Sequence, residues 1–277
     1  MLYRPAPLDF SRNVLVFVHV PKVAGTAVGA AFVAAVGADA HCLLRLEKIG
    51  KIHPNRPRKF VWETRKFLRS AITRAWGDDP LLPKGLGSEQ LDRLAILKGH
   101  VTLGAEPKTG RQPVYITVAR DPVDRFLSDY YCRFDIRAAW PSGKRERHAF
   151  WAYEIDRFVD YVYKRRSWTD TNLQCRYIGG RGDFAAAKDA IDNRVFLAAP
   201  TNRLDGFLEL LRPILPSLPA HAPRANVGKA RLEKMQPSRE SLEKIREMVA
   251  EDQRLFDYVS KDFDEVYRRY AASALVA

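Results

Sequence analysis

A short run near the start of the chain, residues 14–20, constrains the fold most. It reads VLVFVHV and is apolar at every position except His19. A strand buried on both faces has this composition, which is typical of a parallel sheet. A turn over residues 21–25 follows, and then an Ala-rich helix over residues 26–36, with Gly37 at its end. Strand, loop and helix together predict the first half of a βαβ unit.

Two further runs predict strands, at residues 114–119 and 194–199. A shorter apolar run over residues 94–98 precedes Gly99 and His100. Helical patterns fill the sequence between and after these strands, over residues 57–76, from 122 onward, 152–165, 202–211 and 238–270, the last of which could form one or two helices. This alternation predicts an α/β fold with a central, mainly parallel sheet flanked by helices. Without repeats or long linkers, we expect one domain over residues 1–277, with its core at about 14–270.

The chain is basic, with 46 Lys and Arg against 33 Asp and Glu, a net charge of +13. Residues 41–76 hold ten basic side chains and only two acidic ones, and part of this stretch predicts a basic amphipathic helix over residues 57–76. Such a surface attracts polyanions, among them nucleic acid, anionic lipid and sulfated or phosphorylated ligands. A solvated helix face on a basic protein is the other interpretation, because net charge alone names no partner.

The three cysteines, Cys42, Cys132 and Cys175, show neither metal-ligand spacing nor a disulfide framework. No apolar run approaches the roughly 20 residues of a membrane span, and residues 1–13 do not resemble a secretory signal. We therefore expect a cytoplasmic protein without a transmembrane segment.

The loop after the first strand could bind an anion. Consecutive backbone N–H groups at a strand–loop–helix turn point outward together, and the helix dipole adds to them. Lys22 supplies a charge and Thr26 a hydroxyl donor. The spacing of a Walker loop is absent, and the other interpretation is an ordinary strand-to-helix connection with an exposed Lys22.

A second cluster begins at Arg120, where the strand over residues 114–119 ends. Open α/β sheets bind ligands at this edge. Arg120 could bind a phosphate through two parallel hydrogen bonds. Ser128, two turns into the next helix, could donate a hydrogen bond to the same group. Alternatively, Arg120 pairs with a nearby carboxylate and Ser128 is a surface serine.

These two segments, HVPKVAGTA at residues 19–27 and RDPVDRFLSDYY at 120–131, resemble the motifs of the carbohydrate-type, membrane-associated sulfotransferases and their bacterial relatives. Weaker similarities lie at 98–101, 172–174, 224–229 and 251–258. The resemblance implies a P-loop-like site for the donor 3′-phosphoadenosine 5′-phosphosulfate (PAPS), which leaves as adenosine 3′,5′-bisphosphate (PAP).

The resemblance also implies individual roles. Lys22 would stabilise the bridging oxygen of the donor, and His100 would take the proton from the acceptor hydroxyl. Arg120 and Ser128 would hold the 3′-phosphate. The remaining donor-binding residues would be Val23, Ala24, Gly25, Thr26, Ala27, Asn226 and Lys229. Val23 and Ala27 replace the hydroxyl residues that the family usually has, so two side-chain donors to the phosphosulfate are missing.

Sulfuryl transfer resembles phosphoryl transfer, an in-line displacement in which positioning and charge stabilisation dominate. A sulfonate donor needs little help from a metal if a lysine supplies the charge, so we expect no metal. An alcohol acceptor benefits from a base, and histidine is the usual one. We expect a glycan or small-molecule acceptor with a hydroxyl or amine, which could carry acidic groups, and no specific nucleic acid. The alternatives are a nucleotide-dependent kinase or other phosphoryl transferase, and a non-catalytic polyanion-binding protein.

Overall fold

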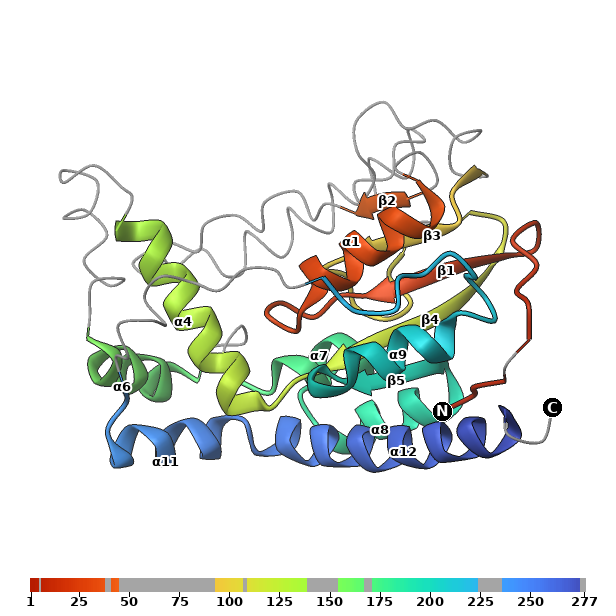
Figure 1. Ribbon diagram of the computed structural model, residues 1–277. Helices are drawn as coiled ribbons and strands as arrows, with labels where there is room; N and C mark the ends of the chain where they lie inside the picture. The colour runs from red at the N-terminus through yellow and green to blue at the C-terminus, as the bar shows by residue number, and fades with distance from the viewer. Residues whose placement is uncertain are drawn as a thin grey trace.

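The structure is a computed structural model that describes residues 1–4, 6–37, 41–44, 93–106, 109–138, 154–166, 171–223 and 236–274. Within them, five parallel strands form one sheet in the order β2-β3-β1-β4-β5 (Figure 1). The predicted α/β fold with a mainly parallel sheet is confirmed. The strands are β1 (Asn13–Val18), β2 (His41–Leu44), β3 (Ile96–Gly99), β4 (Gln112–Ala119) and β5 (Val195–Pro200).

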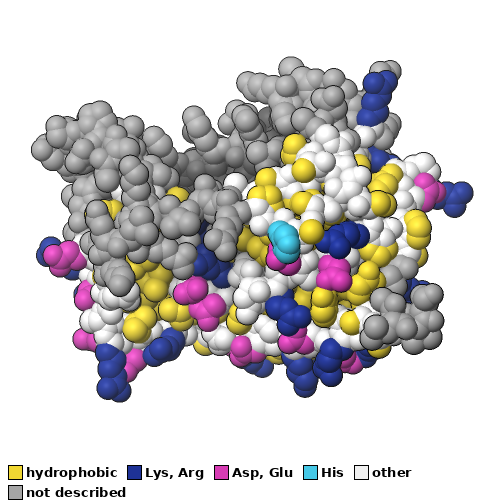
Figure 2. Space-filling view, in the orientation of Figure 1, with side chains coloured by type: hydrophobic (Ala, Val, Ile, Leu, Met, Phe, Trp, Pro, Cys, Tyr) yellow, Lys and Arg dark blue, Asp and Glu magenta, His cyan; other side chains and the backbone are white. Residues whose placement is uncertain are grey.

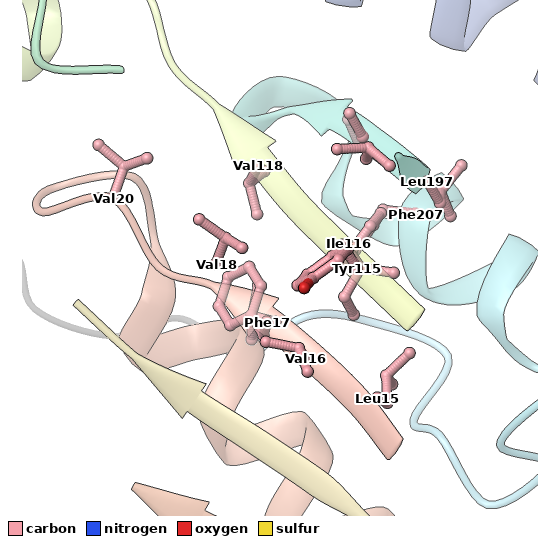
Figure 3. Close-up of a cluster of buried hydrophobic side chains, with 14 of the residues drawn as sticks. Leu15, Val16, Phe17, Val18, Val20, Tyr115, Ile116, Val118, Leu197 and Phe207 are labelled. Atoms are coloured by element: carbon pink, nitrogen blue, oxygen red, sulfur yellow. The ribbon is translucent and has the colours of Figure 1, made fainter. Parts of the chain in front are cut away.

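The central strand, β1, is the apolar run on which the fold prediction depends. Its residues from Val14 to Val18 are at most 1% exposed, as expected for a strand covered on both faces. Side chains of β4, β5 and a following helix pack beside it (Figure 3). At its end, the Thr117 hydroxyl of β4 donates to the Val18 carbonyl at 2.9 Å, so the two strands are tied together just before the loop.

Helices connect and flank the strands. They are α1 (Gly25–Val36), α4 (Pro122–Ala138), α6 (Ile155–Arg165), α7 (Leu173–Gly179), α8 (Phe184–Asn193), α9 (Leu204–Leu211), α11 (Arg239–Met248) and α12 (Ala250–Ala274), with a 3₁₀ turn, η2 (Thr201–Arg203), before α9. Helices α4, α6 and α11 pack around a hydrophobic cluster of their own at one side of the sheet (Figure 1). The long α12 runs past α7, α8 and β5.

Several local predictions are confirmed. Helix α1 ends at Gly37, which has φ of 80°. Asp121 caps α4 by accepting a hydrogen bond from Asp124 N at 2.8 Å. The four side chains predicted to face inward from residues 152–165 are buried, although the helix begins at Ile155; they are Ile155, Phe158, Val159 and Val162.

The structure sets the bounds of the remaining elements. The apolar run at residues 94–98 overlaps strand β3, which covers residues 96–99, and the helix predicted over residues 202–211 begins as the 3₁₀ turn η2. The pattern over residues 238–270, which allows one or two helices, forms two that meet at Val249. β2, α7 and α8 were not predicted. The basic helix expected over residues 57–76 lies outside the described residues.

Candidate active site

Three neighbouring strands, β3, β1 and β4, end at the same edge of the sheet. His100 directly follows β3, the loop over residues 19–24 follows β1, and Arg120 directly follows β4. From β1 the chain moves to the β2 side of the sheet, and from β3 it crosses to the β4 side. A change of direction of this kind opens a crevice at the carboxyl ends of parallel strands, where ligands bind. These strand ends therefore bring Lys22, His100 and Arg120 to one edge of the sheet.

The loop between β1 and α1 has an unusual main-chain conformation. Lys22 and Ala24 have φ of 72° and 60°, in the left-handed region. The N-cap residue of α1, Ala24, has no polar side chain with which to cap the helix. Left-handed residues at such a turn direct successive N–H groups into one concavity, and the positive end of the helix dipole favours an anion there. The loop can therefore bind an anion largely through its main chain.

The two positions that lack the expected hydroxyl groups face the protein interior. The Val23 side chain is fully buried, and Ala27 is 7% exposed. The Val23 side chain thus packs in the core and holds the loop there. Only the backbone N–H of Val23 is left to contribute to an anion site. Thr26, in the first turn of α1, is exposed and retains its hydroxyl.

Gly25 allows His19 to approach the start of α1. A Cβ at Gly25 would lie 1.8 Å from His19 Nε2, so no larger residue fits while the ring stays in place. The His19 ring stacks on Phe17, with ring centroids 5.7 Å apart, and lies 4.1 Å from the His100 centroid. Burial, aided by the neighbouring charges of His100, Lys98 and Lys22, lowers the pKa of His19 to about 2. His19 is therefore neutral at physiological pH.

His100 is oriented by His19. Its Nδ1 lies 2.8 Å from the His19 carbonyl oxygen. A carbonyl oxygen can only accept, so Nδ1 carries the proton, and in the neutral ring Nε2 is left as the proton acceptor. Part of the ring is exposed. Loss of water contacts is the main cause that lowers the pKa of His100, and the charges of Lys98 and Lys22 lower it further, against the hydrogen bond to His19. The geometry and the charge both favour a neutral base.

Arg120 contacts the loop directly. Its Nη1 donates to the Lys22 carbonyl at 3.1 Å. The alternative partner, Asp124, lies 3.8 Å from Nη2 and is itself 57% exposed, so this pair is weak. Ser128, half-buried, follows on the same helix, α4. The other two predicted donor-binding residues, Asn226 and Lys229, lie outside the described residues.

Two residues near the site had no role in the sequence interpretation. Lys98 is 7% exposed, and its Nζ lies 1.9 Å from the place where a Cβ on Gly29 would stand, so it packs against the second turn of α1. Burial lowers the pKa of Lys98. Gln174 is fully buried, and its amide bonds to the main chain of Arg120. Its place in the short NLQ segment was the only signal available.

The remaining expectations concern metal, membrane and surface charge. Within the part of the chain that the structure describes, no group of three His, Cys, Asp or Glu side chains could hold a metal ion. None of the described helices has the length and apolar character to cross a membrane. Figure 2 shows acidic and basic side chains interspersed on the described surface of the face it draws, rather than one basic patch.

Comparison with known proteins agrees with this geometry. A family model described as the sulfotransferase family matches residues 8–177, which is more than half of the chain. The matched region includes β1 with its loop, β3, β4 and Arg120, and it ends within α7. No curated protein matches the chain.

Proposed function

Because this chain belongs to the sulfotransferase family, and so transfers sulfuryl groups, we propose that its donor is PAPS and that its acceptor is a hydroxyl, or an amine, on a glycan or small molecule. The observation that carries the proposal is the contact between Arg120 and the Lys22 carbonyl. It puts a guanidinium suited to a 3′-phosphate beside a loop suited to a 5′-phosphosulfate. PAPS carries both groups on one adenosine.

In this proposal the loop after β1 and the end of β4 bind different groups of the donor. The N–H groups of residues 23–27, with the Lys22 ammonium and the Thr26 hydroxyl, would hold the phosphosulfate. Arg120, at the end of β4, and Ser128, on α4, would hold the 3′-phosphate by charge-assisted hydrogen bonds. Recognition of the phosphosulfate would depend mostly on the main chain, because Val23 and Ala27 are turned inward.

In the proposed reaction the acceptor oxygen attacks the sulfur in line with the bond to the 5′-phosphate. As that S–O bond breaks, negative charge builds on the leaving phosphate oxygen, and Lys22 stabilises it. The acceptor proton passes to Nε2 of His100, the nitrogen left free by the hydrogen bond from Nδ1 to His19. PAP then leaves, and the proton on His100 returns to solvent.

The charges around His100 favour an acidic acceptor. Lys22 and Lys98 both act on the two imidazoles of the site, and Arg120 adds a third positive charge where it contacts the Lys22 carbonyl. An acceptor that carries sulfate or carboxylate groups would gain from this field, whereas a cationic acceptor would be repelled.

Ligand-dependent thermal unfolding tests the donor. A ligand that binds only the folded protein stabilises it by about 2.7 kcal/mol at 100 times its dissociation constant. We expect PAP to raise the melting temperature at concentrations where ATP and adenosine 5′-monophosphate (AMP) have little effect. Equal or greater stabilisation by ATP would instead support a phosphoryl transferase. A screen with labelled PAPS against acidic and neutral glycans and small alcohols would then identify the acceptor class.

A further inference from the structure

The main chain at Arg120 is held by a side chain instead of a strand. The pairing of β4 with β1 ends at Thr117, and its pairing with β5 ends at Ala119, so neither ladder reaches Arg120. There the amide of Gln174 bonds to the main chain in place of a strand. Its Oε1 accepts from Arg120 N at 2.9 Å, and its Nε2 donates to Arg120 O at 2.8 Å. A primary amide offers the donor and acceptor of a peptide group, so it pairs with Arg120 as a strand residue would.

Gln174 is itself held by two helices that cap each other. Asp252, in the first turn of α12, accepts from Gln174 N at 3.0 Å and from Cys175 N at 2.8 Å, at the start of α7. Asn172 Oδ1 in turn accepts from Glu251 N and Asp252 N, at 3.1 and 3.3 Å, at the start of α12. Asp252 and Gln174 are both fully buried. The amide of Gln174 is therefore fixed in place before any ligand binds.

We propose that Gln174 is a positioning residue for recognition of the donor's 3′-phosphate, an inference that rests on the proposed function. It fixes the peptide groups on both sides of Arg120, and so aims the guanidinium along the loop toward the Lys22 carbonyl. Without the two hydrogen bonds from Gln174, Arg120 would keep its charge, but its guanidinium would no longer be held in one orientation. A guanidinium binds a phosphate through two parallel hydrogen bonds that require one orientation of its plane. A change in the direction of Arg120 would therefore weaken its binding of the 3′-phosphate.

The proposal also gives α12 a part in donor recognition. The family match ends at residue 177, so α12 lies beyond it. The helix reaches the site through one chain of contacts, in which Asp252 holds the first turn of α7 and Gln174 in that turn holds Arg120.

The test compares PAP with AMP, which differs from PAP by the absence of the 3′-phosphate. Calorimetry on the full chain would give both affinities for the wild type, Gln174→Met and Gln174→Glu. Methionine keeps the volume but removes both hydrogen bonds, and glutamate keeps the acceptor for Arg120 N but removes the donor. We expect the preference for PAP over AMP to fall by about tenfold in Gln174→Met, since two main-chain groups lose their partners, and to fall also in Gln174→Glu, where a carboxylate oxygen would face the Arg120 carbonyl. The affinity for AMP should stay within about twofold of wild type.

Cys175→Ala is the matched control. Cys175 is the next residue on α7 and equally buried, but its thiol faces Asp252. We expect this variant to lose some thermal stability and to keep the wild-type preference for PAP. A double-mutant cycle with Arg120→Ala separates the roles further. If Gln174 acts through Arg120, Gln174→Met should weaken PAP binding no further in that background.

The outcomes are distinct. If the wild type does not prefer PAP over AMP, the proposed function fails. If the wild type prefers PAP and the Gln174 variants keep that preference, the positioning role is wrong. Equal losses for PAP and AMP, or additive losses in the cycle, would show that Gln174 only supports the fold, and would also overturn the proposal. If Gln174→Met does not fold, the Gln174→Glu comparison decides in the same way.

Discussion

The guanidinium of Arg120 lies 3.1 Å from the main-chain carbonyl of Lys22, although 98 residues separate them in the sequence. One hydrogen bond thus joins the end of β4 to the loop after β1. Because the carbonyl of Lys22 and the N–H of Val23 belong to the same peptide plane, the contact also sets the direction of that N–H. The two halves of the proposed donor site are therefore mechanically connected.

Arg120→Ala should consequently affect both halves. Truncating one partner of a desolvated, charged hydrogen bond costs about 2–5 kcal/mol, so PAP binding should weaken by a factor of 30 or more, roughly. AMP binding should also weaken, by less, because the loop loses the contact at Lys22. Calorimetry with both ligands checks this. Wild-type affinity for PAP in the mutant would remove Arg120 from the donor site.

Lys22→Ala should lower turnover more than donor affinity. The ammonium is needed for charge that appears only as the S–O bond breaks, whereas the loop N–H groups still hold the ground-state anion. Lys22 has φ of 72°, so alanine keeps the backbone strain that lysine has. Lys22→Gly relieves it and serves as the second variant. Both should lose rate at saturating PAPS, and normal turnover in either one would remove Lys22 from the chemistry.

His100→Ala should reduce turnover by about 10²–10⁴-fold and leave PAP affinity near wild type. The pH dependence follows from the lowered pKa of His100. The base must be neutral, so turnover is full above its pKa and falls as pH drops through it. The acid limb of the wild-type profile should therefore lie below the ordinary histidine value of about 6.5. A limb at or above that value, or a mutant that keeps its rate and its limb, would point to another base.

Gly25→Ala should damage the donor site, because its Cβ would stand 1.8 Å from His19 Nε2 in a ring packed between Phe17 and His100. Gly29→Ala, one turn later, is the matched control. Its Cβ would meet Lys98 Nζ, the free end of a flexible chain that can move aside. We expect PAP-dependent stabilisation to be lost in Gly25→Ala and largely kept in Gly29→Ala. Similar losses in both variants would contradict the special role of the His19 contact.

The sequence predicted the part of the site that depends on short-range patterns. The apolar composition of β1 and β4 located the strand ends, and Asp121 with Pro122 located the start of α4. Parallel strands then required Lys22, His100 and Arg120 to meet at one edge. These are consequences of local residue preferences and one topological rule.

The rest of the site depends on contacts between distant residues. Gln174 lies 54 residues from Arg120, and nothing in its neighbours indicates that it pairs with the main chain there. The break between α11 and α12 has the same origin. The periodic pattern continues through Val249 and allows one or two helices. Asn172 accepts hydrogen bonds from the N–H groups of Glu251 and Asp252, and such bonds can form only where a helix begins. A tertiary contact therefore decides between the two alternatives.

The reciprocal caps between α7 and α12 bear on how small a working version of this enzyme could be. A polypeptide that stopped at residue 177, where the family match ends, would retain β1, β3, β4 and every described residue assigned to the chemistry. It would lack β5, leaving β4 as an open edge prone to aggregation, and it would lack Asp252, leaving the start of α7 uncapped. The segment that carries the family's signature is thus shorter than the segment that can fold and hold Arg120 in place.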